Sequence, residues 1–344
     1  MIKELINGDC VNVNINLLSK KLGIHRATVQ KKVRKLMEEE VLTQPAYTFP
    51  ALFQLYPLLV LVWADVPRND KTARFFFEDP HVFAAFSCME GPYNTFLIEY
   101  FQDMEHYHLW RDSLVREGKL PERLNRAAAD PYMLSNKMMF KNDPSCFLSL
   151  LREELELSGK VNVGEWAMDS LSFEILVALI KGDCVWTNHS RLSKKLDMHR
   201  KTVTRRLNRM LRDKTLEHPR CQFPHLLMPP GFNMVVTRIG LRSRREEFRR
   251  ALVEDSNVPR AYDAITGPHN FVAFTAFRRI DDFFDWGEKL NDRFPGEITA
   301  MTNSVLSSRK IHTTRQQKIS LGLVERKLKE MVQNKSRSNK NKYN

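Results

Sequence analysis

Hydrophobic residues recur at helical spacing in the part of the chain that begins near residue 169. The apolar run from Leu171 to Ile180 ends before Gly182, which predicts a helix that stops at a glycine. A short helix around Leu192 and Leu196 follows, and after a tight turn a longer helix is predicted from Arg200 to Asp213. Three helices with a tight turn before the third are typical of a helix-turn-helix.

The third of these predicted helices has two different faces. Its inward stripe is apolar and consists of Val203, Leu207, Met210 and Leu211. Its opposite face is polar and basic, with Lys201, Arg205, Asn208, Arg209 and Arg212. The segment from Thr215 to Phe223 is predicted to form two short strands in the position of a wing. The pattern therefore predicts a winged helix-turn-helix.

Beyond residue 233 the hydrophobic pattern changes to short strand-like runs alternating with helical stretches. Strands are predicted over 233–242, 258–266, 271–279 and 297–307, and helices over 244–255 and 280–294. The turn Gly267-Pro268-His269-Asn270 joins the two central strands. This βαββαβ order is that of a ferredoxin-like α+β module.

The whole pattern occurs twice in the chain. Leu5-Ile6-Asn7-Gly8-Asp9-Cys10-Val11 recurs as Leu179-Ile180-Lys181-Gly182-Asp183-Cys184-Val185, His25-Arg26-Ala27-Thr28-Val29 as His199-Arg200-Lys201-Thr202-Val203, and Gly91-Pro92-Tyr93-Asn94 as Gly267-Pro268-His269-Asn270. Identity at so many separate positions indicates an internal duplication. The predicted fold class is therefore α+β, with two tandem units, each a winged helix-turn-helix followed by a ferredoxin-like βαββαβ module.

The repeat sets the expected domain boundaries. We expect a first winged helix-turn-helix over 1–50, a first ferredoxin-like module over 51–137, a linker over 138–168 with a helix from Pro144 to Leu157, a second winged helix-turn-helix over 169–224, a second ferredoxin-like module over 225–312 and a basic tail over 313–344. Met1 aligns with Ile175, so the first helix of the first copy is truncated. Either the true start lies upstream or the first winged helix is weakened, and both interpretations stay open.

The distribution of charge along the chain indicates what this architecture binds. The 344 residues include 54 Lys+Arg and 41 Asp+Glu, a formal net charge of +13. The excess is concentrated in residues 17–40, 191–214 and 325–344, the first two of which contain the predicted third helices. Basic side chains neutralise phosphates and release counterions, while residues at the start of a recognition helix reach base edges in the major groove. The duplicated basic helix predicts binding to double-stranded DNA.

The predicted DNA-binding residues lie on both third helices. They are Arg26, Thr28, Lys31, Lys32 and Lys35 in the first copy, and Arg200, Lys201, Thr202, Arg205, Arg206 and Arg209 in the second. Residues at each helix start are expected to read bases, and those further along to contact phosphates. Because the two helices differ, an asymmetric site dominated by the more basic second copy is expected.

These motifs resemble the Lrp/AsnC (feast/famine) family of transcriptional regulators, in tandem duplicate. The resemblance rests on Leu192-Ser193-Lys194-Lys195-Leu196, on His199-Arg200-Lys201-Thr202-Val203-Thr204-Arg205-Arg206-Leu207, on Val258-Pro259-Arg260-Ala261-Tyr262 and on Thr266-Gly267-Pro268-His269-Asn270, and it covers residues 2–137 and 169–312. It implies DNA binding through the third helix and pairing of the α+β modules within the chain or in a homodimer. In many members a small amino acid binds between the modules, but Asn94 and Asn270 stand where the family usually has an acid, so the effector stays unknown.

Two alternatives use the same architecture. Sirohaem decarboxylases resemble it, sometimes as fused pairs, with a haem-like substrate bound by the α+β halves. An architectural protein would bind DNA with little sequence preference. The basic third helix in both copies favours a sequence-specific transcriptional regulator over either. We therefore expect a cytoplasmic DNA-binding protein that is not an enzyme and has no cofactor and no metal site.

Other groups with chemical potential have simpler explanations. Asp103, Glu105, His106 and His108 begin a predicted helix, where acids are favoured by the helix dipole. His218, Cys221 and His225 are spaced like metal ligands but are not repeated in the first copy. His25 and His199 are expected to cap the third helices or to contact phosphate, and Trp110 and Trp286 to pack in the cores.

Two wider classes are set aside. The five cysteines form no CxxC motif, which favours a reducing compartment over a disulfide framework. The longest apolar run, from Leu52 to Ala64, is too short to span a bilayer and contains Pro57. No membrane association is expected.

Overall fold

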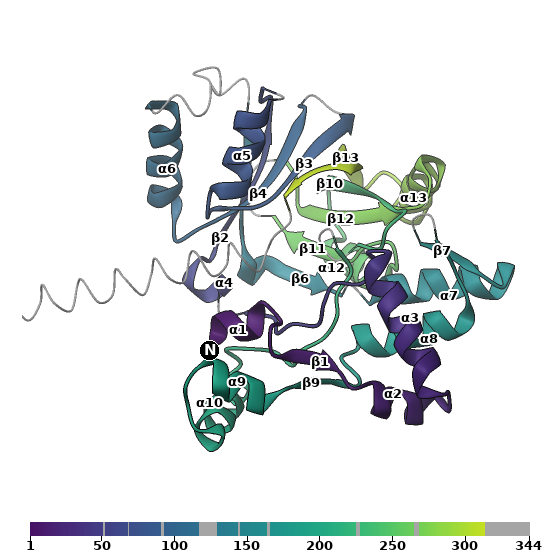
Figure 1. Cartoon of the computed structure of the whole chain (residues 1–344). Coiled ribbons are helices and arrows are strands. Elements are labelled where there is room, and N and C mark those ends of the chain that lie inside the picture. The colour runs from purple at the N-terminus through teal and green to yellow at the C-terminus, as the bar shows by residue number, and fades with distance from the viewer. Residues whose placement is uncertain are drawn as a thin grey trace, which may run out of the picture.

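The computed structural model describes residues 1–313 except 51, 68, 91–92, 117–128, 144, 164–165, 225–227 and 265–267. The chain has an α+β half and a helical half, which lie above and below one another in Figure 1. Among the helices described, none combines the length and hydropathy that a membrane span requires.

One nine-stranded sheet forms the α+β half, in the order β5-β2-β4-β3-β13-β10-β12-β11-β6. The first copy supplies β2 (Leu58–Ala64), α5 (Asp70–Glu78), β3 (Val82–Glu90), β4 (Thr95–Phe101), α6 (Met104–Arg116) and β5 (Ala129–Ser135), preceded by α4 (Leu52–Leu55). The second copy supplies β10 (Asn233–Leu241), α12 (Arg245–Glu254), β11 (Arg260–Asp263), β12 (Phe271–Phe277), α13 (Ile280–Arg293) and β13 (Ile298–Thr313). The βαββαβ order is confirmed in both copies.

The two modules exchange strands at both ends. β13 pairs with β10 up to Leu306 and with β3 of the other module from Val305 onward. Similarly, β5 pairs with β2, and after a short 3-10 turn (Asn136–Met138) the chain continues as β6 (Met139–Asn142) and pairs with β11. The segment predicted as the start of a linker is therefore a strand. The two modules are joined by backbone hydrogen bonds, which fix their relative position.

Each module has an inner and an outer core. Phe96 on β4 and Phe274 on β12 meet between the modules, with ring centroids 6.2 Å apart. On the outer faces the helices of each module cover separate apolar clusters. Trp110 and Trp286 lie there, as predicted, and each indole also donates a hydrogen bond, to Asp79 at 3.0 Å and to Asp255 at 2.6 Å. The duplication thus preserved a tryptophan–aspartate pair in both modules.

The helical half contains two helix-turn-helix bodies joined by a two-stranded ribbon. The first copy supplies α1 (Ile2–Ile6), β1 (Val11–Val13), α2 (Ile15–Leu22) and α3 (Arg26–Glu38), and the second supplies α8 (Ser170–Ile180), β9 (Val185–Thr187), α9 (His189–Lys195) and α10 (Arg200–Arg212). β1 and β9 pair antiparallel, with Asn12 opposite Trp186. The predicted third helix of the second copy is confirmed to within one residue at its end.

The two copies exchange their first helices. Leu5 and Ile6 of α1 are buried in one cluster with Val203 and Leu207 of α10, whereas α8 packs against α3. Lys195 of α9 forms ion pairs with Glu4 and Asp9 of the other copy, and Lys21 of α2 forms one with Asp183. Each three-helix body therefore combines the first helix of one copy with the second and third helices of the other. The domain boundaries predicted at residues 50 and 224 stay predictions.

The wing predicted over Thr215–Phe223 is wrong. No hairpin forms there, and the one isolated bridge found among the described residues joins Ala46 of the first copy to Arg220 of the second. Two further hydrogen bonds connect the same segments, from Thr43 N to the carbonyl of Gln222 at 2.8 Å and from Glu217 N to the carbonyl of Thr48 at 3.1 Å. Exchange of the first helices places these equivalent segments side by side, so they bond to each other instead of folding back.

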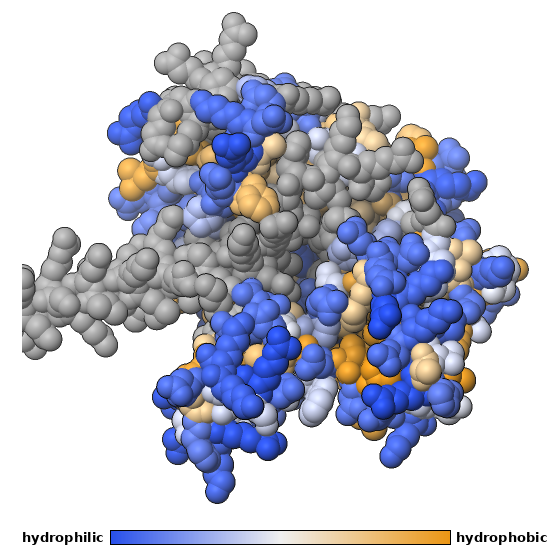
Figure 2. All heavy atoms as spheres, viewed as in Figure 1, coloured by the Kyte–Doolittle hydropathy of each residue, from blue (hydrophilic) through white to orange (hydrophobic). Residues whose placement is uncertain are grey.

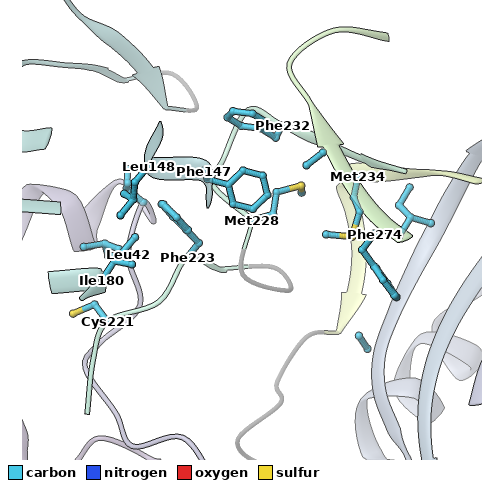
Figure 3. Close-up of a cluster of buried hydrophobic side chains, with 14 of the residues drawn as sticks. Leu42, Phe147, Leu148, Ile180, Cys221, Phe223, Met228, Phe232, Met234 and Phe274 are labelled. Atoms are coloured by element: carbon cyan, nitrogen blue, oxygen red, sulfur yellow. The ribbon is translucent and has the colours of Figure 1, made fainter. Parts of the chain in front are cut away.

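A helix between the two units joins the halves of the molecule. It is α7 (Cys146–Ser158), predicted over 144–157, and a small hairpin of β7 (Val161–Val163) and β8 (Trp166–Met168) follows it. Phe147 of α7 lies between Phe223 and Phe232, at centroid distances of 6.2 and 5.6 Å, in the cluster that Figure 3 shows. This cluster is continuous with the inner core of the sheets, so both halves share one apolar core.

The helix exchange predicts a crossed effect of mutation. Leu5 and Leu179 occupy equivalent positions and both are fully buried, so replacing either by alanine is expected to cost about 2–5 kcal/mol. Leu5→Ala should loosen α10 of the other copy, and Leu179→Ala should loosen α3. Hydrogen exchange of the amides in α3 and α10 measures this, and an effect of Leu5→Ala confined to α2 and α3 would contradict the exchange.

Candidate nucleic-acid interface and inter-sheet cluster

The outer face of α10 forms one continuous basic surface. An open depression is lined by Arg200, Lys201, Thr204, Arg205, Arg206, Asn208, Arg209, Arg212 and Asp213, all from α10 or its end. The lysine and all five arginines are exposed. Asp213 is the one acid of this lining, and it accepts from Arg209 at 3.3 Å and from Arg212 at 3.4 Å in exposed ion pairs. Figure 2 shows hydrophilic residues gathered over this part of the molecule, at its lower left.

A histidine fixes the start of each third helix. His199 Nδ1 accepts a hydrogen bond from Lys201 N at 3.2 Å, and His25 Nδ1 accepts one from Ala27 N at 3.3 Å. The predicted capping role of both histidines is confirmed. At the start of α9, His189 Nδ1 lies 3.2 Å from Thr204 Oγ1, and burial together with the charge of Arg200 lowers the pKa of His189. A neutral imidazole therefore helps to hold α9 against α10.

The corresponding face of α3 is partly covered by the chain itself. Lys32 donates to both carboxylate oxygens of Asp169, at 2.6 and 2.9 Å, and to Ser172 Oγ at 3.1 Å. Lys35 Nζ lies 4.9 Å from the centroid of the Trp166 ring on β8. Burial tends to raise the pKa of Asp169, but hydrogen bonds from Lys32 and Ser172 outweigh it and lower the pKa to about 2. The α3 face thus already has an anionic partner.

The predicted DNA-binding residues therefore divide into two groups. Arg200, Lys201, Arg205, Arg206 and Arg209 share one open surface, whereas Thr202 is half-buried and outside its lining. In the first copy Arg26, Thr28 and Lys31 are exposed, but Lys32 and Lys35 are engaged with Asp169 and Trp166. Sequence reasoning missed both partners. The one available signal was an aspartate directly before a predicted helix, a typical capping residue.

A second group of polar and aromatic side chains lies between the α+β modules. Arg238 on β10 is only 8% exposed, and its guanidinium carbon lies 4.3 Å from the centroid of the Trp63 ring and 5.7 Å from that of Tyr132. Trp63 pairs with Phe96, and Arg238 pairs with Val272, the equivalent of Phe96. Trp63 and Arg238 are therefore equivalent positions of the two copies that meet across the inner core.

An imidazole lies beside this pair. His269 is 8% exposed, its ring centroid is 6.2 Å from that of Tyr132, and its Nε2 is 3.4 Å from Thr302 Oγ1. A guanidinium can pair with a carboxylate, and an aromatic ring can stack under a guanidinium. We name Arg238, Trp63, Tyr132 and His269 the inter-sheet cluster. Its signal in the sequence was a single charge, Arg238, within an otherwise uncharged strand.

The two asparagines that follow the turns have a structural role. Asn94 accepts from Val66 N at 3.1 Å and donates to the carbonyl of Val66 at 3.0 Å. Asn270 accepts from Leu241 N at 2.5 Å. Each asparagine therefore holds its turn against the end of the first strand of its module. Gly91 and Gly267, predicted as turn residues, lie outside the described residues.

The remaining candidates show local contacts. Asp103 accepts from the backbone and the ring of His106, at 2.9 and 2.7 Å, and the backbone bond is the main cause of its lowered pKa. Cys221 is fully buried, and burial raises its pKa to about 12. His225 lies outside the described residues, among which no group of three or more His, Cys, Asp or Glu is placed to hold a metal ion.

Comparison with solved structures shows the fold over 94% of the chain. No family model matches the sequence, and no curated protein matches it. The crystal structure of the sirohaem decarboxylase NirDL matches with a TM-score of 0.53 and 11% identity, over 94% of this chain and 99% of that one. Its complex with an iron-uroporphyrin III analogue matches with a TM-score of 0.52 and 12% identity, over 94% and 96%. AsnC of E. coli matches with a TM-score of 0.29 and 13% identity, over 39% of this chain and 87% of that one.

These findings correct two expectations. Regulators of the AsnC type are among the structural neighbours, but they cover only about 40% of the chain rather than both units. The expectation that the chain is not an enzyme is contradicted, because the architecture shared over the full length is that of an enzyme.

Proposed function

We propose that the chain binds double-stranded DNA through α10. The observation that carries this proposal is the exposed basic face of that helix, whose lining contains a single acid. With 13 residues, α10 is about 20 Å long, and the major groove admits a helix of this kind. Arginines on a fixed helix supply both phosphate neutralisation and bidentate contacts to guanine.

Residues along α10 would have different roles. Arg200, Lys201 and Thr202 stand in its first turn, where a recognition helix contacts base edges. Arg205, Arg206 and Arg209 lie further along and suit the phosphates. Readout by Arg200 would make the protein a sequence-specific regulator. Arg200→Ala should then relax the base preference, with about 1–3 kcal/mol lost on the preferred site; an unchanged preference would exclude Arg200 as a reader.

Selection of duplexes from a random DNA pool tests this function. The full-length protein is used at about 150 mM salt, where nonspecific binding is weakened. An enriched motif supports a sequence-specific regulator. Retention without enrichment supports the architectural alternative, and no retention of DNA overturns the proposal.

A second function is supported by a different observation. The full-length likeness to NirDL, together with the inter-sheet cluster, supports an enzyme that acts on a carboxylate-bearing tetrapyrrole. In this second proposal Arg238 would pair with a carboxylate, Trp63 and Tyr132 would pack against the macrocycle, and His269 would move a proton. The two functions use different halves of the fold and are compatible.

Titration with iron-uroporphyrin III, followed by absorption spectroscopy, tests substrate binding. Saturable binding with a shifted absorption band supports the enzyme, and incubation with sirohaem should then release CO2 as a proton replaces each lost carboxylate. Absence of a spectral shift with both compounds would overturn this second function and leave DNA binding untouched.

A further inference from the structure

We propose that α10 alone reads DNA, and that α3 has been withdrawn from DNA by an internal cover consisting of Trp166, Ala167 and Asp169. This inference rests on the proposed DNA binding and goes beyond it, because it limits one chain to one half-site. The duplicated sequence predicts two reading helices instead. The observations that carry the inference are the contacts of the cover and the lower exposure of Lys32 compared with its equivalent, Arg206.

Asp169 is fixed in place by the helix that it begins. Its carboxylate caps α8 by accepting from Ser172 N at 2.9 Å, and the same group accepts from Lys32. The side chain of Lys32 is 22% exposed, and its ammonium donates to both Asp169 and Ser172. A phosphate that approached Lys32 would have to displace a carboxylate and would meet its negative charge. The pair therefore opposes DNA contact at the centre of α3.

The hairpin strand β8 extends the cover along α3. Ala27, Thr28, Lys31 and Lys35 line one groove together with Trp166, Ala167 and Asp169. Thr28 lies in the first turn of α3, where a recognition helix would read bases. The indole of Trp166 faces Lys35 at 4.9 Å. The groove that would receive a DNA strand is thus bordered by the chain's own hairpin, whereas the depression on α10 is lined by α10 and Asp213 alone.

The second helices of the two copies, α2 and α9, also differ in the donors that they offer to a phosphate. Leu17 in α2 is 51% exposed, and its equivalent in α9 is the exposed Arg191. Ile15 begins α2 where His189 begins α9. A leucine and an isoleucine give a phosphate backbone no donor, while arginine and histidine do. The first copy therefore offers fewer donors at the start of its second helix than the second copy does.

The duplication provides a matched test. Lys31 and Lys35 are the equivalents of Arg205 and Arg209, and all four side chains are exposed, so Lys31→Ala plus Lys35→Ala removes the same net charge as Arg205→Ala plus Arg209→Ala. DNA affinity is measured against salt concentration for the full-length protein and both variants, with hydroxyl-radical footprints on the selected duplex. We expect one continuous half-site footprint, a change of less than about twofold for the lysine variant, and a loss of about tenfold or more for the arginine variant.

The outcomes distinguish the single-helix inference from the proposed DNA binding itself. Equal losses for the two variants, or a footprint with two separated half-sites per chain, would overturn the single-helix inference while DNA binding stands. Absence of binding by the unmodified protein would overturn both. Asp169→Asn plus Trp166→Ala supplies an independent readout: with the cover weakened, the footprint should lengthen, and the salt slope should steepen by about one for each additional phosphate that the protein neutralises.

Discussion

Replacing Arg205 and Arg209 of α10 by alanine is expected to weaken DNA binding by about tenfold or more on every sequence. Both side chains are exposed on the basic face and lie beyond the first turn, where contacts to phosphate are favoured over contacts to bases. The loss should therefore be uniform across duplexes. Because each phosphate that is no longer neutralised keeps its counterion, the slope of log affinity against log salt should fall by about two.

Equilibrium titrations at several salt concentrations measure this effect on a preferred duplex and on an unrelated one. Lys289→Ala is the control. Lys289 lines a separate groove beside α7 and α13, so its substitution removes a positive charge at a place away from α10. Its salt slope should remain that of the unmodified protein. An unchanged slope for the arginine variant would remove α10 from the DNA interface, whatever happened to the affinity.

Local pattern explains why most elements could be predicted from the sequence. The helix expected from Arg200 to Asp213 spans Arg200–Arg212, and the strand expected over 233–242 spans Asn233–Leu241. Periodicity and end signals are properties of each segment alone, so they survive in any arrangement of the segments. The strand expected over 258–266 begins only at Arg260, because Pro259 has no N–H to donate to a neighbouring strand.

Pairing between the two copies explains what could not be predicted. The apolar stripe of α1 fits the body of either copy, because both copies carry the same pattern, and the sequence does not state which one it joins. Once Leu5 packs with Leu207, the segments around Ala46 and Arg220 meet and no wing forms. The same exchange brings α8, and with it Asp169, against α3. A single long-range pairing thus explains both why no wing hairpin forms and why the α3 face has Asp169 as a partner.

The inter-sheet cluster also depends on contact between equivalent positions of the two copies. Trp63 and Arg238 occupy the same position in the two copies, and these two positions are in contact with each other. The residue at this position differs between the copies. Self-pairing of like residues would have placed two arginines or two tryptophans there. Divergence of the two copies instead produced a guanidinium over an indole, an arrangement that a homodimer of identical units cannot make at this position. This contact therefore requires two units with different residues at the equivalent position.

Arg238→Met is expected to reduce the affinity for iron-uroporphyrin III by about thirtyfold or more. Truncating one partner of a buried charge pair typically costs about 2–5 kcal/mol, and each 1.4 kcal/mol corresponds to about tenfold. Arg238 is 8% exposed on the inner face of β10, so water cannot replace the guanidinium beside a carboxylate. Methionine keeps much of the volume against Trp63, which limits the loss of packing. Absorption titrations of the variant and the unmodified protein measure the change.

Arg278→Met is the matched control for this variant. Its guanidinium also lies over an aromatic ring, 4.4 Å from the centroid of Phe232, and it pairs with Glu154 at 2.5 Å, outside the inter-sheet cluster. We expect this variant to lose stability without losing tetrapyrrole affinity, because its charge contacts no substrate. Arg238→Lys, which keeps the charge but not the fork of donors, should recover part of the binding. If Arg238→Met bound iron-uroporphyrin III as tightly as Arg278→Met, the tetrapyrrole would not lie between the modules, and the surface of the α+β half would have to supply its carboxylate partners.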